Sequence, residues 1–223
     1  NGTVQDLMSR PLTSGNYTAG EVYTVERTPP NVSSITRVDT SPANTGTVRY
    51  TVLFDESVTG VDSGDFSLTT AGLSGVSVTN VAGSGDTYTV TVDTGSGDGT
   101  LRLDVSDTDG ITDLAGNPLG GAGAGNGDYT AGQVYTIDKT APDVTINQAA
   151  GQDDPVNAVP VVFDVAFSES VTGFDASDVI FIGSATGLLY NVSGSGTSYT
   201  VTVTSVGVDG TIVPTIPGGG ATD

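Results

Sequence analysis

The chain lacks the side chains on which most enzyme chemistry depends. Its 223 residues include no cysteine, no histidine and no tryptophan. Without cysteine and histidine, catalytic triads and thiol nucleophiles cannot form, and zinc sites with nitrogen or sulfur ligands are excluded. Two carboxylates could still hydrolyse a glycoside, but aromatic residues make up only 6% of the chain and leave few rings to stack against a sugar. We therefore predict that the chain is not an enzyme, and we disfavour a carbohydrate-binding module for the same reason.

Basic residues are also scarce. Six lysines and arginines stand against 26 acidic residues, which gives a net charge of −20. A chain of this charge repels phosphate groups, so we expect no nucleic-acid partner and no anionic membrane surface as partner. No apolar run is long enough to span a bilayer, so we expect no direct membrane insertion. The absence of cysteine excludes a disulfide scaffold, so burial of a core must hold each folded unit, with or without the help of a metal.

What the chain does contain is an internal repeat of roughly 110 residues. The segment 17–32, YTAGEVYTVERTPPNV, recurs 112 positions later as YTAGQVYTIDKTAPDV. The motif FDESVTG that begins at Phe54 recurs as FSESVTG from Phe167, and GDTYTVTV from Gly85 recurs as GTSYTVTV from Gly196. We predict three parts: 1–27 as the last strand region of a preceding repeat, 28–139 as a complete repeat, and 140–223 as a repeat without its last strand.

Apolar residues alternate with polar ones, which is typical of β-strands with one buried face. Tyr88, Val90 and Val92 alternate with threonines, and no segment has convincing helical spacing. Clusters of Gly, Ser, Asn and Asp separate the apolar segments, as expected for turns. The complete repeat is predicted to hold about seven strands, near 32–38, 47–54, 65–70, 75–82, 87–93, 99–105 and 132–138. We expect an all-β chain of tandem immunoglobulin-like β-sandwiches.

The joints between repeats contain proline. Thr-Pro-Pro at Thr28 and Thr-Ala-Pro at Thr140 connect one predicted strand to the next. Proline fixes φ and keeps the preceding residue extended. We therefore expect a short, stiff linker and consecutive domains arranged end to end as a rod.

The order of these motifs resembles the bacterial immunoglobulin-like repeats of large secreted surface proteins. The motifs are acid-Lys/Arg-Thr-Ala/Pro-Pro, then Phe-x-Glu-Ser-Val-Thr-Gly, then Gly-Ser-Gly-x-x-Tyr-x-Val-x-Val, then Thr-Asp-Leu-Ala-Gly-Asn. The resemblance covers nearly the whole chain and implies a secreted or cell-surface location. It implies a passive extender in adhesins, biofilm proteins, surface layers or filaments, often made rigid by calcium between domains.

Two acidic groups are the candidate metal ligands. Calcium takes six to eight oxygen ligands from carboxylates, carbonyls and water. The first group lies within one loop of the complete repeat: Asp107, Asp109, Asp113 and Asn117. The second recurs in both copies: Glu56, Asp62 and Asp65 in one, Glu169, Asp175 and Asp178 in the other. By analogy with calcium-bridged tandem domains, an acid at a joint, Glu26 or Asp138, could complete a site between neighbours.

A second interpretation of these acids stays open. Asp and Asn populate turns because their side chains bind nearby backbone N–H groups, so many of them can be turn residues alone. Calcium is the only cofactor we expect.

Two functions also stay open. In the first, the chain is a stretch of a longer structural and adhesive array, whose partners are neighbouring repeats and a host, surface or polysaccharide ligand. In the second, it is a subunit of a filament or surface layer. Its incomplete sandwich would then accept the strand 18–27 of another copy, which would satisfy an open sheet edge.

Overall fold

The computed structural model describes residues 5, 7–10, 19–219 and 221–222, and these form an all-β protein. The chain divides into two compact units, Asn1–Asp138 and Lys139–Asp223. The helical content of the described residues is two three-residue 3-10 turns, η1 (Ser63–Asp65) and η2 (Ala176–Asp178). No helix in this part of the chain is long and apolar enough to cross a membrane.

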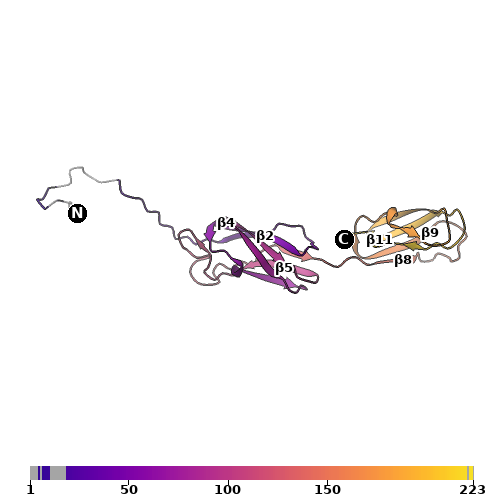
Figure 1. Cartoon of the computed structure of the whole chain (residues 1–223), viewed down its shortest axis with the longest axis horizontal. Coiled ribbons are helices and arrows are strands. Elements are labelled where there is room, and N and C mark those ends of the chain that lie inside the picture. The colour runs from indigo at the N-terminus through magenta and orange to yellow at the C-terminus, as the bar shows by residue number, and fades with distance from the viewer. Residues whose placement is uncertain (1–4, 6, 11–18, 220, 223) are drawn as a thin grey trace. The chain divides into compact units, whose positions relative to one another are not determined.

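The described residues of unit 1 form two antiparallel sheets (Figure 1). One sheet has the order β1-β2-β4, with β6 also paired to β2, and the other has the order β3-β5-β7. The strands are β1 (Val32–Arg37), β2 (Thr47–Thr59), β3 (Phe66–Ala71), β4 (Ser77–Asp93), β5 (Gly99–Val105), β6 (Thr112–Asp113) and β7 (Val134–Ile137).

The core of unit 1 lies between these two sheets. Along β2, alternate side chains are buried, and they share one hydrophobic cluster with the inward-facing side chains of β5 and β7. Such burial of one face of each sheet is consistent with a β-sandwich. The members with 0% exposure include Val48, Tyr50, Val52, Val90, Val92, Leu101, Leu103 and Tyr135.

Strand β4 reverses direction within its own length. Thr79 Oγ1 donates to the carbonyl oxygen of Thr91 at 3.2 Å, although the two residues are 12 positions apart. A straight strand would separate them by roughly 40 Å. At the reversal, Gly83 has φ of 150°, and a Cβ there would lie 2.4 Å from the carbonyl oxygen of Thr87. The separate strands predicted near 75–82 and 87–93 are therefore two arms of one continuous element.

The segment that follows β1 joins the opposite sheet. Ala43 forms a parallel bridge with Ile137 of β7, whereas β1 itself pairs with β2. The Ala43 N–H donates to the carbonyl oxygen of Thr136 at 3.0 Å, and the Asp138 N–H donates to that of Ala43 at 3.1 Å. The segment after β1 and the end of unit 1 are thus hydrogen-bonded to each other.

The described part of unit 2 repeats this arrangement with fewer strands. Its strands are β8 (Val144–Gln148), β9 (Val161–Val171), β10 (Ile180–Phe181), β11 (Leu189–Ser205) and β12 (Pro214–Thr215). One sheet has the order β11-β9-β8 and the other consists of β10 and β12. Ile180 pairs with Thr215 at the positions where Ser67 of β3 pairs with Asp104 of β5 in unit 1. Within the described residues, β12 has β10 as its single partner strand.

Candidate functional site

Four of the predicted ligands form two copies of the same turn. Asp62 caps η1: its Oδ1 accepts from the Gly64 N–H at 2.6 Å, and its own N–H donates to Asp65 Oδ2 at 2.8 Å. Asp175 and Asp178 form the same capping box around η2, with a distance of 2.8 Å for the second bond. Side chains that satisfy free N–H groups at a helix start are stabilising. The repetition of these acids in both units therefore has a structural role.

The two capping boxes differ in electrostatics. Burial, followed by the nearby charges of Asp62 and Asp107, raises the pKa of the Asp65 carboxyl despite its hydrogen bond from the Asp62 N–H. In unit 2, hydrogen bonds from the side chain and N–H of Ser177 lower the pKa of Asp175. Asp65 is 5% exposed, so its charge is less solvated than that of the exposed Asp175.

Asp107 and Asp109 hold the glycine-rich loop that follows them. The N–H of Gly127 donates to Asp107 Oδ2 at 3.1 Å, and the N–H of Gly123 donates to Asp109 Oδ1 and Oδ2, each at 3.1 Å. Asp107 Oδ1 also accepts from the Asp109 N–H at 2.9 Å. In turn, the Asp107 N–H donates to Asp128 Oδ1 at 2.8 Å. These carboxylates are therefore engaged by backbone N–H groups.

Asp113 and Asn117 lie at the other end of the same acidic loop and meet Glu26. Asn117 Nδ2 donates to Asp113 Oδ2 at 2.7 Å and to Glu26 Oε2 at 2.6 Å. Asp113 Oδ1 accepts from the N–H groups of Ala115 and Asn117, both at 2.8 Å. Burial alone raises the pKa of Asp113, but the hydrogen bonds from Asn117 outweigh it and lower the pKa to about 2.

Glu56 belongs with this second group. Burial and then the charges of Asp113, Glu26 and Asp55 raise the pKa of Glu56. Its position on β2 explains the contact, because Val58 and Thr59 of β2 pair with β6, which contains Asp113. The charges that raise the pKa of Glu56 are thus those of Asp113, Glu26 and Asp55, and not those of Asp62 and Asp65, with which the sequence pattern had grouped it.

The donor set can be compared with what a calcium ion needs. Among the described residues, no three His, Cys, Asp or Glu side chains are grouped so that they could hold a metal ion. The carboxylates of Asp107, Asp109 and Asp113 accept hydrogen bonds from N–H groups, which compete with any cation. As arranged, these residues do not form a calcium site. Binding would require Glu26 and Glu56 to turn toward Asp113.

The two remaining predicted ligands lie in strands or at their ends. Asp138 directly follows β7, and Glu169 lies in β9 of unit 2. In the repeat, Asp138 corresponds to Glu26 and Glu169 corresponds to Glu56.

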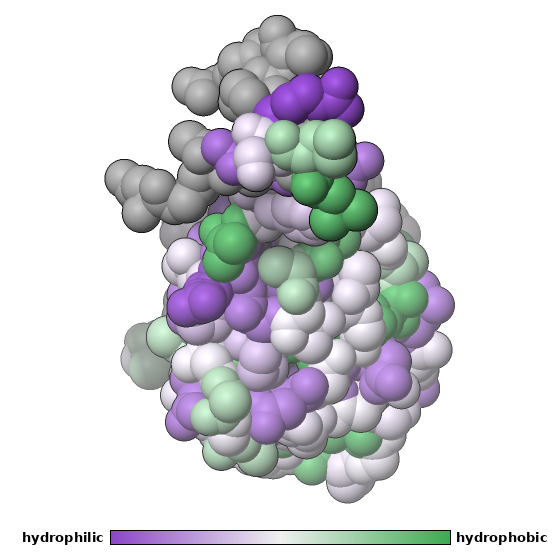
Figure 2. All heavy atoms as spheres, turned by 90° about the vertical axis from the view of Figure 1, so that its left-hand side faces the viewer, coloured by the Kyte–Doolittle hydropathy of each residue, from purple (hydrophilic) through white to green (hydrophobic). Residues whose placement is uncertain are grey.

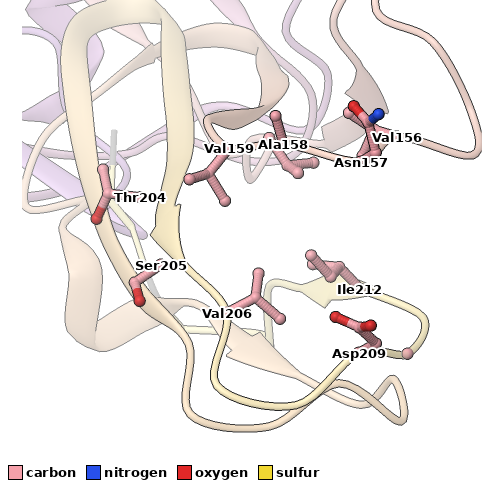
Figure 3. Close-up of a pocket in the computed structure, with 11 residues that line it drawn as sticks. Val156, Asn157, Ala158, Val159, Thr204, Ser205, Val206, Asp209 and Ile212 are labelled. Atoms are coloured by element: carbon pink, nitrogen blue, oxygen red, sulfur yellow. The ribbon is translucent and has the colours of Figure 1, made fainter.

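A cavity of about 630 Å³ opens into unit 2 beside β12. Val156, Val159, Val161, Val206, Gly210 and Ile212 line it together with more polar residues. Figure 3 shows Val159, Val206 and Ile212 around this hollow. Val156 and Val159 are 43% and 44% exposed, so the cavity presents apolar side chains to solvent. No sequence motif predicted this cavity, because the residues that line it come from two segments far apart in the sequence, 156–161 and 204–212.

The sequence also did not predict a hydrogen bond made by the residue directly before the first strand of each unit, β1 or β8. The Asn31 N–H donates to Asp55 Oδ1 at 2.7 Å, and the Asp143 N–H donates to Ser168 Oγ at 2.8 Å. Asp55 and Ser168 both follow the phenylalanine of the repeated motif. Both side chains can accept a hydrogen bond, and this shared property is the signal in the sequence from which the bond could have been predicted.

Figure 2 shows how polar and apolar residues are distributed over one face of the described residues. On the face shown in Figure 2, most of the surface is neutral or hydrophilic, with hydrophobic residues interspersed. Single exposed apolar residues of this kind are normal for proteins in water.

Comparisons with known proteins identify no relative: no family model, no curated protein and no solved structure matches the chain.

Proposed function

We propose that this chain is a non-catalytic structural repeat of an extracellular stalk or fibre, built from tandem immunoglobulin-like sandwiches. The observation that carries the proposal is the duplication of structural hydrogen bonds. Tyr88 donates its hydroxyl hydrogen to the carbonyl oxygen of Val58 at 3.0 Å, and Tyr199 donates to that of Val171 at 3.1 Å. Units that repeat the same internal hydrogen bonds and share no catalytic group are suited to act as spacers and to bear load.

The immunoglobulin-like assignment is supported by the strand arrangement of unit 1. Two antiparallel sheets of β1, β2, β4, β6 and of β3, β5, β7 enclose one hydrophobic cluster. β1 and β2 lie in one sheet, and from β2 onward consecutive strands alternate between the two sheets, as connections in Greek-key sandwiches do.

The secreted or cell-surface location that we propose rests on the resemblance of the repeated motifs to bacterial immunoglobulin-like repeats of large secreted surface proteins. The net charge of −20 keeps such a chain soluble. Each unit also buries a hydrophobic cluster without any disulfide. The partners we propose are neighbouring repeats, copies of the same chain, and a host, surface or polysaccharide ligand bound by the array.

Calcium is proposed at one place, near Asn117, whose side-chain amide donates to Glu26 and Asp113 and where burial and the charges of these two acids raise the pKa of Glu56; the acids would have to rearrange around the ion. An ion that binds the folded form alone would raise the melting temperature of unit 1 by mass action. We expect this temperature to rise with millimolar CaCl₂ and to fall again with EDTA. The variant Glu56→Gln should reduce the shift, whereas Asp178→Asn in unit 2 should leave it unchanged. Equal melting in saturating CaCl₂ and in EDTA would remove calcium from the proposal.

The spacer role has its own test. Small-angle X-ray scattering of the 223-residue chain measures its maximum dimension. For a stiff spacer we expect an end-to-end dimension that stays the same between low and high salt. A maximum dimension close to that of two units packed side by side would contradict the spacer function.

The filament function remains the second candidate. The observation that favours it is the coexistence of an exposed strand-like segment, 19–27, and the cavity beside β12.

A further inference from the structure

The segment 19–27 has a strand sequence but forms no strand in the structure. Residues 19–31 have no strand assignment, and Figure 1 draws no arrow before β1. Tyr23 is 85% exposed, and Val22 and Val25 are 92% and 73% exposed. Three large apolar or aromatic side chains in four positions are thus left in water. Residue 18, the first of the segment predicted to be donated, lies outside the described residues.

The same sequence is a core strand in unit 1. Tyr23 and Val25 correspond to Tyr135 and Ile137 of β7, which are 0% and 1% exposed. Val22 corresponds to Val134, which faces outward and is 45% exposed. The segment 19–27 therefore has the inward and outward pattern of a strand that fits a sheet edge of this repeat.

Unit 2 offers a matching edge. In unit 1, Leu101 pairs with Tyr135 and is 0% exposed. Its counterpart in the repeat is Ile212, which lines the cavity and is only partly buried.

The opposite wall of the cavity matches as well. Ala43, which bridges Ile137 in unit 1, is 9% exposed, whereas its counterpart Val156 is 43% exposed. Both directly follow a proline, Pro42 and Pro155. The cavity thus lies where the side chains of β7 lie in unit 1.

We propose that the segment 19–27 of one copy of this chain binds as a strand between residues 210–213, which lead into β12, and the loop 156–159 of unit 2 in a second copy. The proposal rests on the tandem-repeat architecture proposed above. A strand added to an open edge gains main-chain hydrogen bonds, and its alternate side chains give specificity. Burial of Tyr23 and Val25 in the cavity adds the hydrophobic contribution.

The register follows from unit 1. There Gly99 pairs with Ile137, Thr100 with Thr136, Leu101 with Tyr135 and Arg102 with Val134. Transfer of these pairs places Thr24 opposite Thr211 and Tyr23 opposite Ile212. Thr24 and Thr211 are both exposed, so this pair would lie on the outer face of the completed sheet.

One acceptor of unit 1 is already occupied in unit 2. Tyr135 donates to the carbonyl oxygen of Arg49 at 2.8 Å. At the corresponding Val162, Gln152 Nε2 donates to the carbonyl oxygen at 3.2 Å. The Ala149 N–H also donates to this oxygen, at 3.0 Å, so both of its lone pairs are used and the hydroxyl of a bound Tyr23 could donate there only by displacing Gln152. The main gain on binding is therefore the burial of apolar surface and the strand pairing.

The cysteine-free chain allows a direct test by disulfide trapping. In Thr24→Cys/Thr211→Cys, the two thiols of different copies would face each other as a directly opposed antiparallel pair, close enough to oxidise. Thr24→Cys/Thr100→Cys is the matched control, because Thr100 has the same position in unit 1 but is already paired with Thr136 of β7. Thr24, Thr100 and Thr211 are exposed, but Thr211 Oγ1 accepts from the Ser184 N–H at 3.0 Å, so circular dichroism of the reduced variants checks first that the fold is kept.

We expect the first variant to form a ladder of dimers and higher oligomers on a non-reducing gel, several-fold more abundant than for the control. Equal yields of oligomer from the two double variants would overturn the proposal. A disulfide that forms only within one copy of the chain would overturn it too. The absence of any crosslink would overturn it as well.

A second measurement needs no crosslink. Light scattering coupled to size exclusion should show oligomers of the unmodified chain that grow with concentration. Tyr23→Asp should reduce them to monomer, whereas Val22→Asp, at an outward position, should retain them. A peptide of residues 19–27 should compete with oligomer formation. Monomer at all concentrations would overturn donation between copies while leaving the spacer function, tested by scattering dimensions, intact.

Discussion

Tyr135 donates its phenolic hydrogen to the carbonyl oxygen of Arg49 at 2.8 Å, across two sheets and 86 positions of sequence. The hydroxyl oxygen of Tyr135 accepts from the N–H of Asp39 at 2.8 Å and from that of Val38 at 3.1 Å. The ring packs edge-on against Tyr50 with centroids 5.1 Å apart. One side chain of β7 thus holds the first strands of unit 1 in place.

Removal of this hydroxyl should weaken unit 1. Tyr135→Phe leaves one carbonyl and two N–H groups with one partner fewer, which we expect to lower the free energy of unfolding by about 1–3 kcal/mol. Urea denaturation followed by circular dichroism measures this. The matched control is Tyr23→Phe, which should not change the midpoint because Tyr23 is 85% exposed. Equal midpoints for both variants would contradict the role of Tyr135.

The reversal in β4 should be sensitive to a single methyl group. In Gly83→Ala, the new Cβ would lie 2.4 Å from the carbonyl oxygen of Thr87, at a φ of 150°. We expect a loss of about 1–3 kcal/mol. Gly46→Ala is the control, because nothing lies within 4 Å of its Cβ position. It should be neutral or stabilise by about 0.4–1 kcal/mol. Thermal melting of the two variants compares them, and a Gly83→Ala as stable as Gly46→Ala would refute the steric argument.

The two capping boxes should act on separate units. Asp62→Ala removes the cap of η1 and should lower the stability of unit 1 by about 1 kcal/mol. Asp62→Asn keeps a side-chain oxygen for the Gly64 N–H and should cost less. Asp175→Ala should lower the unfolding midpoint of unit 2 alone. Hydrogen exchange followed by mass spectrometry resolves the two units, and faster exchange in the unit that was not altered would contradict the assignment.

Asp113 should make unit 1 sensitive to acid. Its pKa in the folded protein, about 2, lies below the ordinary value of 3.8. A carboxyl with a lowered pKa contributes stability that is present above its unfolded pKa and is lost as the pH falls through the folded pKa. Asp113→Asn should therefore flatten the loss of stability between about pH 4 and pH 2.

Urea midpoints over this pH range provide the measurement. Asp86→Asn, at an exposed turn, should keep the slope of the unaltered chain. The pKa of Asp65 is raised in the folded protein, so acidification increases the contribution of this carboxyl to stability. Asp65→Asn should remove that increase. An Asp113→Asn variant with an unchanged slope would rule out this carboxyl as the acid-sensitive group.

The sequence predicts the all-β class and the long strands because alternate burial leaves a period of two. Val48, Tyr50 and Val52 carry this signal in β2, and all three are fully buried. Strand β6 has only two residues, which is too short for any period, and it was not predicted. Each arm of β4 shows the alternation of apolar and polar residues. The sequence does not show that the two arms are one continuous element, because they are joined through the backbone at Gly83 and not through side chains.

The candidate site is less visible in sequence because its contacts join distant positions. Asn117 meets Glu26 across 91 positions, and Glu56 meets Asp113 through the pairing of β2 with β6. Spacing along one loop had grouped Asp107 with Asp113 instead. Backbone N–H groups occupy these carboxylates, and a sequence does not show whether an acid binds an N–H or an ion.

The parallel bridge between Ala43 and Ile137 determines how unit 1 responds to tension. The chain enters the bridge from its N-terminal side at Ala43 and leaves it toward the C-terminus after Asp138. A pull on both ends draws two parallel segments past each other lengthwise. The Thr136 and Asp138 hydrogen bonds to Ala43, together with the Thr136 N–H bond to Ser41 Oγ at 2.9 Å, then carry the force side by side. They must break together in shear, whereas an antiparallel end would peel open one bond at a time.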